Sequence, residues 1–227
     1  MLTFAMGLRQ SLGIFMPELT RDIGISVSDF TLAIAVQNLM WGFLQPVAGA
    51  LSVRWGLRPL MVGGSLLYLL GLVVLAAAHS TTGVVIGAGL FIGTSMACTG
   101  PALASAAVSR PVSAAMRSAV LGAVSAAGSL GAMLSAPIGQ ALNQAQGWRV
   151  GVVGFALLAL VMLPAAWVAG RVDKVPLPPH AGQLGGGATA ALGTAIRHVP
   201  FVVLTIAFFV CGMQLIFLTT HLPSYLQ

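Results

Sequence analysis

Seven apolar stretches, each about as long as a membrane-spanning helix, constrain this chain more than any other feature. A helix needs about 20 largely apolar residues to cross the hydrocarbon core of a bilayer. Barrel strands would instead alternate over roughly ten residues, and these longer runs lack that alternation. The sequence therefore predicts an all-α, polytopic transmembrane helix bundle. The expected spans cover residues 2–17, 30–51, 60–78, 83–108, 118–142, 150–170 and 199–222.

The composition agrees with a membrane protein and argues against other classes. Of the 227 residues, 58% are hydrophobic and 6% charged, whereas a soluble domain carries about 25% charged residues. The net charge is +6, but the basic residues are scattered singly, so we expect the lipid bilayer as surroundings and no nucleic-acid partner. Metal-ligand spacings, catalytic triads and phosphate-binding loops are lacking from the sequence. We therefore expect no enzyme activity, no metal and no cofactor.

The chain divides into three expected parts. Residues 1–170 hold six spans and form one helical lobe. Residues 171–198 contain Arg, Lys, Asp, prolines and a run of three glycines, which is typical of a polar linker. Residues 199–227 hold the seventh span. The first span begins at Met1 without a preceding cytoplasmic segment, so we expect a truncated start.

The distribution of basic residues among the loops predicts the orientation in the membrane. Cytoplasmic loops carry an excess of Lys and Arg. The loops after the first, third and fifth spans hold only Arg21 and Arg149. We therefore expect the other loops and the linker to be cytoplasmic. Their basic residues are Arg54, Arg58, Arg110, Arg117, Arg171, Lys174 and Arg197.

Arg9 is the most informative single residue because it lies within an apolar span. A charge in the hydrocarbon region is costly and usually faces a cavity or a partner, and no Asp or Glu lies within any expected span to neutralise it. Guanidinium binds carboxylate through two parallel hydrogen bonds, so Arg9 is a candidate group for an anionic solute. The alternative is that Arg9 extends to the cytoplasmic headgroups.

Other polar side chains within the spans are further candidates for lining a solute path. Hydrogen bonds between helices would also explain each of them. These candidates are Gln10, Gln37, Asn38 and Gln214.

Small residues four apart predict close helix packing in two spans. The pairs Gly83 and Gly87, and Gly89 and Gly93, belong to the fourth span. Ser118, Gly122 and Ala126 belong to the fifth. Such spacing lets helix backbones approach closely, so we expect both spans to line a tight interior. Prolines in Gly100-Pro101 and at positions 46 and 137 are expected to break or bend helices.

The turn after the second span, "GALSVRWGLR", resembles the cytoplasmic signature of major facilitator superfamily transporters. The resemblance matches Gly49, Arg54, Gly56 and Arg58, and it implies a gating turn at the cytoplasmic face. Val53 stands where the family pattern has Asp. That acid would interact with the N-terminus of a neighbouring helix, where negative charge is favoured, so the departure puts this interaction in doubt.

Three further strings, "GLRQSLGIFMPELTRDIG", "QNLMWGFLQPVAGAL" and "THLPSYL", are similar to bacterial members near the monocarboxylate-porter and oxalate–formate antiporter branch. The resemblance implies a secondary transporter of a small organic anion in the bacterial inner membrane, working by alternating access. It also implies a twelve-helix protein of which this chain is the first lobe plus helix 7, with helices 8–12 of the second lobe missing. Such a piece alone is expected not to transport.

Two other functions stay open at this point. One is a non-transporting membrane scaffold or assembly module. The other is a carrier of the same superfamily whose solute is not a carboxylate, such as a drug-efflux protein.

Overall fold

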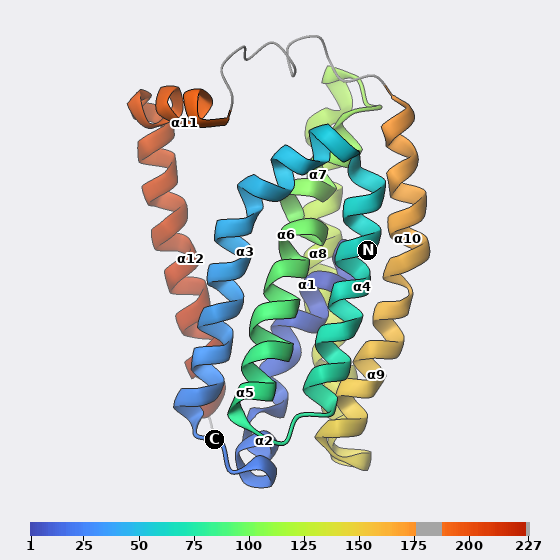
Figure 1. Cartoon of the computed structure of the whole chain (residues 1–227), viewed down its shortest axis with the longest axis vertical. Helices are drawn as coiled ribbons and strands as arrows, with labels where there is room; N and C mark the ends of the chain where they lie inside the picture. The colour runs from blue at the N-terminus through green and yellow to red at the C-terminus, as the bar shows by residue number, and fades with distance from the viewer. Residues whose placement is uncertain (176–187, 226–227) are drawn as a thin grey trace. The chain divides into compact units, whose positions relative to one another are not determined.

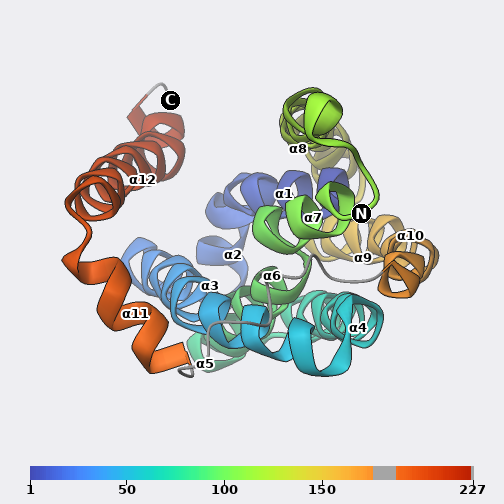
Figure 2. The ribbon, with the colours of Figure 1, turned by 90° about the horizontal axis from the view of Figure 1, so that it is seen from above.

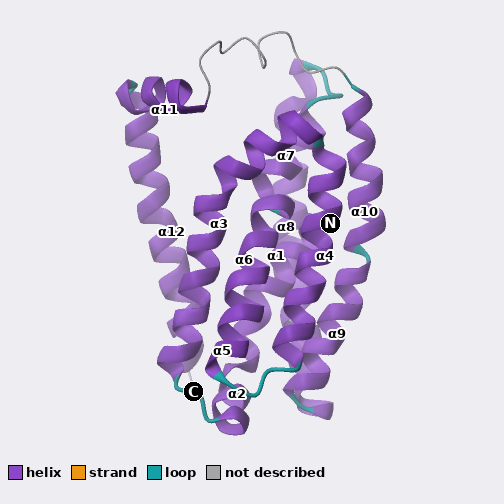
Figure 3. Ribbon diagram, in the orientation of Figure 1, coloured by secondary structure: helices purple, strands orange, loops and turns teal. Residues whose placement is uncertain are grey.

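The computed structural model describes residues 1–175 and 188–225, and every regular element in that part is a helix (Figures 1 and 3). Within these two ranges, five helical stretches are long and apolar enough to cross a membrane: Val27–Trp55, Leu57–Ala76, Thr81–Ser109, Ala114–Gln146 and Trp148–Lys174. The all-α, polytopic prediction is thus confirmed. In chain order the elements are α1 (Leu2–Gln10), η1 (Ser11–Phe15), α2 (Met16–Ile23), α3 (Val27–Trp55), α4 (Leu57–Ala76), α5 (Thr81–Val84), η2 (Val85–Phe91), α6 (Ile92–Thr99), α7 (Pro101–Ser109), α8 (Ala114–Gln146), α9 (Trp148–Leu160), α10 (Met162–Ala169), η3 (Gly170–Lys174), α11 (Ala188–Arg197) and α12 (Val199–Tyr225).

The chain forms two compact units, Met1–Val175 and Pro176–Gln227. The first holds α1 to η3, and the second holds α11 and α12 among its described residues. Within the segment expected as a linker, η3 continues the helical run of α10 and α11 is a ten-residue helix.

In the first unit, α6 and α7 lie between α1 on one side and α3 and α4 on the other when the bundle is viewed end-on (Figure 2). The helix α1 packs against α8, while α9 packs against both α4 and α8. A continuous core of buried apolar side chains joins these helices, with Leu8, Phe15, Tyr68 and Phe155 among its largest members. The ring of Phe15 meets Phe155 edge-on, with centroids 5.3 Å apart.

The polar loop expected at residues 18–29 is shorter than predicted. Pro17 occupies the first turn of α2, where its missing N–H costs nothing, and Leu19 is buried, so the helix continues to Ile23. Gly24, at φ +73°, ends it. The side chains of Ser26 and Asp29 then cap each other's backbone N–H groups and start α3.

Glycine packing in the fourth span is confirmed. A Cβ on Gly87 would lie 2.8 Å from the carbonyl oxygen of Gly71 on α4, and one on Gly93 would lie 2.6 Å from that of Gln37 on α3. The chain at η2 and α6 therefore fits between two helix backbones because it lacks side chains at these points.

The same prediction is wrong for the fifth span. Ser118, Gly122 and Ala126 on α8 are exposed, because the contact with α1 lies further along the helix. The buried stripe of α8 consists of Gly128, Gly131, Ser135, Gly139 and Asn143. A Cβ on Gly131 would collide with the backbone carbonyl of Thr3 on α1, so the glycine is what permits this approach.

The three prolines differ in their effect. Gly100 is extended, and Pro101 begins α7, so the helical run breaks between α6 and α7. Pro46 and Pro137 stay inside the continuous helices α3 and α8.

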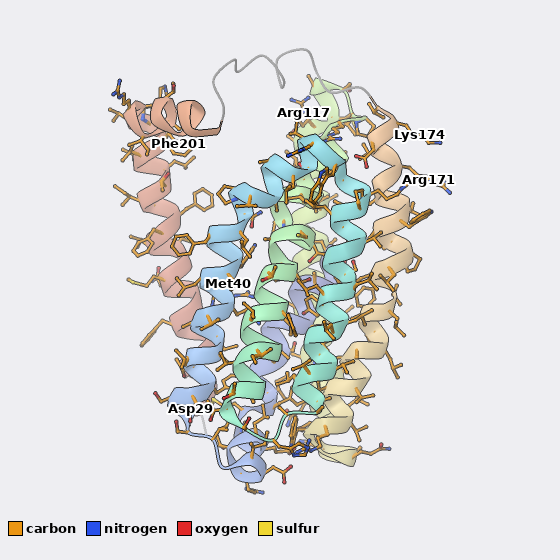
Figure 4. The ribbon with its side chains drawn as sticks, viewed as in Figure 1. Asp29, Met40, Arg117, Arg171, Lys174 and Phe201 are labelled. Carbon is orange, nitrogen blue, oxygen red and sulfur yellow. The ribbon has the colours of Figure 1, made fainter. Side chains whose placement is uncertain are left out.

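Three basic residues of the first unit lie toward one end of its helices. Arg117, Arg171 and Lys174 lie toward this end, and Asp29 lies at the opposite end (Figure 4). We call the first end the basic end.

Candidate functional site

The side chain of Arg9 turns toward the middle of α3. Its guanidinium carbon lies 4.8 Å from the ring centroid of Trp41, a stacked cation–π arrangement, and its Nη2 donates a hydrogen bond to Asn38 Oδ1. Trp41 is 14 residues from each end of α3, which is about 21 Å at 1.5 Å per residue. Met40, its neighbour, is seen midway along that helix (Figure 4). Arg9 is thus held at mid-depth and is not extended toward either end.

Arg9 has no acidic partner in the structure. In the part of the chain that is described, the ion pairs are Arg110–Asp173 at 3.4 Å and Arg149–Asp22 at 3.8 Å. The Nε of Arg9 is shielded from solvent and has no hydrogen-bond partner. A shielded donor without a partner is unusual in folded proteins and costs about 1–3 kcal/mol. The site therefore carries an uncompensated positive charge and an unused donor.

Asn38 holds Arg9 in place. Its Oδ1 accepts from Arg9, and its Nδ2 donates at 2.7 Å to the carbonyl oxygen of Ile34, one turn earlier on α3. Because both ends of the amide are engaged, the orientation of the side chain is fixed. Asn38 thus determines which edge of the guanidinium stays available.

Trp41 contributes a second donor without a partner. Its indole Nε1 is shielded and makes no hydrogen bond. Gly100, at the break between α6 and α7, lies beside it, and a Cβ on Gly100 would be 3.2 Å from this nitrogen. Trp41 is not among the residues predicted for the site. The available signal is its place in the interior of a span, away from the usual interfacial belt of Trp residues.

The structure does not bring the other polar candidates to this cluster. Gln37 is 1% exposed, and its Nε2 donates at 2.6 Å to the carbonyl oxygen of Ala88 on η2, so it joins two helices. Gln10 is exposed on α1. Gln214 is exposed on α12, in the second unit.

The turn with the family-like signature is a one-residue connection. Gly56 alone separates α3 from α4, with φ +88° and ψ 169°, a conformation that only glycine adopts readily. Arg58 stacks on Trp167, 4.7 Å from the ring centroid. Arg54 is exposed, and a Cβ on Gly49 would meet nothing within 4 Å.

An acid from outside the signature occupies the N-terminus of α4. Asp173 on η3 accepts hydrogen bonds from the backbone N–H groups of Leu57 and Arg58, both at 2.8 Å. Arg110 pairs with the same carboxylate. Val53, where the family pattern has Asp, is 56% exposed. Asp173 is not predictable as the partner of this turn from sequence, because 116 residues separate it from Leu57.

A second Arg–Trp pair lies at the end of the bundle opposite the basic end. Arg149 stacks over Trp148, 4.5 Å from the ring centroid. Asp22 Oδ2 accepts a hydrogen bond from Trp148 Nε1 at 2.9 Å and lies 3.8 Å from Arg149 Nε. These side chains line a pocket of about 310 Å³ together with Glu18, Arg21, Gln146 and Gly147. Here a carboxylate of the chain itself accepts the indole hydrogen bond and pairs with the charge of the arginine.

Comparison with known proteins identifies the family. The family model of the Major Facilitator Superfamily matches residues 1–227. Monocarboxylate transporter 11 of Mus musculus is 40% identical over 95 residues, which is 40% of this chain and 20% of that protein. Monocarboxylate transporter 3 of Mus musculus is 30% identical over 94 residues, 41% of this chain and 19% of that protein. The matched segments thus span about a fifth of these relatives.

Proposed function

This chain belongs to the major facilitator superfamily, a family of multi-pass membrane transporters, and we propose that it serves to move a small organic anion, such as a monocarboxylate, by alternating access. Arg9 is the group that recognises the anion. The observation that carries the proposal is the position of Arg9: it is stacked on Trp41 at mid-depth and has no acid beside it.

The charge of the site favours an anion over a neutral solute. A guanidinium without a counter-ion in a poorly solvated setting gains most from a ligand that brings a negative charge. A carboxylate also matches the planar array of guanidinium donors. Each hydrogen bond to a charged group contributes about 1.5–3 kcal/mol, which is enough to offset the loss of the ligand's hydration in part.

Asn38 acts as the positioning residue. It accepts a hydrogen bond from Nη2 of Arg9, and the Nε–H remains for the ligand. The stacking on Trp41 restricts the guanidinium plane. A preoriented donor group loses less entropy when the ligand binds.

The names of the two relatives support the solute class, because both are monocarboxylate transporters. We further propose the bacterial inner membrane as the location, on the resemblance to bacterial members. The basic end is then the cytoplasmic end, as the excess of Arg and Lys predicts.

The experiment that tests the proposal compares acids with their amides. The 227-residue chain in lipid nanodiscs is titrated with acetate, lactate, pyruvate and benzoate, and with lactamide and benzamide as uncharged analogues of the same shape. We expect saturable binding of at least one acid and binding of its amide at least tenfold weaker. Equal binding of acid and amide, or no binding of any acid, would refute anion recognition.

Because a first lobe with one further helix is expected not to transport by itself, the transport part of the proposal is tested in cells that express a complete two-lobe carrier containing this chain. Expression should raise saturable uptake of the acid that binds best, and Arg9→Gln should remove the increase. The matched control is Arg54→Gln, because Arg54 is an exposed arginine outside the cluster. Uptake that persists in Arg9→Gln at equal membrane abundance would exclude Arg9 as the recognition group.

A further inference from the structure

Two of the three stacked Arg–Trp pairs among the described residues differ in the partners of their Arg Nε and Trp Nε1 atoms. At one end of the bundle, Asp22 accepts a hydrogen bond from Trp148 Nε1 and forms an ion pair with Arg149, 3.8 Å from its Nε. At Arg9 and Trp41 the same two kinds of atom, the Arg Nε and the Trp Nε1, are shielded and have no partner. The stacking distances, 4.5 Å and 4.8 Å, are similar.

We infer that Trp41 is the second anion-binding residue, and that its indole N–H and the Nε–H of Arg9 together bind the carboxylate of the solute as Trp148 and Arg149 bind Asp22. The inference rests on the proposed function and adds a specificity-determining residue to it. A single carboxylate satisfies both unused donors at once, so the ligand removes the cost of two buried N–H groups.

The surroundings of Trp41 agree with this role. The indole nitrogen lies beside Gly100, where a Cβ would be 3.2 Å from it, so no side chain at this position covers the N–H. Gly100 also lies at the break between α6 and α7. The third stacked pair, Arg58 and Trp167, lacks this combination, because Trp167 is 56% exposed.

The decisive variant is Trp41→Phe, which keeps an aromatic ring under Arg9 but removes the N–H donor. The probe is the acid that binds best among acetate, lactate, pyruvate and benzoate, titrated into the 227-residue chain in nanodiscs. We expect its affinity to fall at least tenfold, as for loss of a hydrogen bond to a charged group. The matched control is Trp167→Phe, which changes another Arg-stacked tryptophan and should leave the affinity within twofold.

A second measurement uses the protein with its unaltered sequence, so its result does not depend on whether the variant folds. With 15N-labelled tryptophan, the indole N–H resonance that Trp41→Phe removes should shift on saturation with the acid, and the Trp148 resonance should not. An unshifted Trp41 resonance, or an unchanged affinity in Trp41→Phe, would overturn the inference. If Arg9→Gln still abolished binding in that case, the proposed function would stand without Trp41. If none of the four acids bound to the unaltered chain, the proposed function and the inference about Trp41 would both be refuted.

Discussion

The carboxylate of Asp173 accepts a hydrogen bond from the backbone N–H of Leu57 at 2.8 Å and so caps the helix that Leu57 begins. Its second oxygen accepts from Arg58 at the same distance. The first N–H groups of a helix have no partner within the helix, and the N-terminus favours negative charge. The signature turn thus has its acid, supplied by η3 and not by position 53.

Replacement of Asp173 should destabilise this turn. Asp173→Ala removes both acceptors and the partner of Arg110, and loss of a helix cap costs about 0.5–2 kcal/mol. We expect faster hydrogen exchange at the amides of Leu57 and Arg58 and a lower melting temperature in detergent. Lys174→Ala, an exposed neighbour, is the control. Unchanged exchange at the two amides would contradict the capping role.

Gly56 should tolerate no side chain. Its φ of +88° and ψ of 169° strain any other residue by about 1–3 kcal/mol, and a Cβ there would lie 2.7 Å from Asp173 Oδ2. Gly56→Ala should therefore lower the melting temperature more than Gly49→Ala, which adds a methyl group where nothing lies within 4 Å. Equal melting temperatures for the two variants would show that the turn adapts.

The contact between α1 and α8 should depend on Gly131. Alanine at this position would collide with the backbone of Thr3, and overpacking of a tight contact costs about 1–3 kcal/mol. Gly122→Ala on the same helix is the matched control, since its Cβ would meet nothing within 4 Å. We expect reduced thermal stability for Gly131→Ala alone. Similar stability of both variants would mean that α1 and α8 are further apart than described.

The orientation in the membrane can be tested with two cysteines on one helix. Arg117 and Gln144 are exposed and lie near opposite ends of α8. In a background without Cys98 and Cys211, an impermeant thiol reagent applied to intact cells should label Arg117→Cys only after permeabilisation, and Gln144→Cys without it. The reverse pattern would place the basic end outside.

Periodicity and composition were sufficient for the helical class, because apolar length alone specifies a spanning helix. They did not determine which face of each helix is buried. The small residues Ser118, Gly122 and Ala126 have the spacing of a packing stripe, yet the stripe that meets α1 includes Gly131. A sequence pattern does not say which neighbour lies opposite it.

The candidate site was predicted in part. A charge inside an apolar run identified Arg9, and its neighbour Asn38 was selected for its polarity. Gln37, selected on the same grounds, binds a backbone carbonyl instead. Trp41 and Asp173 act through partners at least 32 residues away in sequence, and such pairings become visible only once the helices are assembled.

The most direct test of the central claim, that Arg9 recognises a carboxylate, is the affinity of the best-binding acid for Arg9→Lys and Arg9→Gln, measured beside the membrane abundance of each variant. Lysine keeps the charge but loses the two-pronged geometry, so we expect Arg9→Lys to weaken binding about tenfold or more and Arg9→Gln to abolish it, both at normal abundance. If Arg9 only extended to the headgroups, Arg9→Lys would leave the affinity for the acid unchanged. Unchanged affinity in Arg9→Gln would contradict the claim.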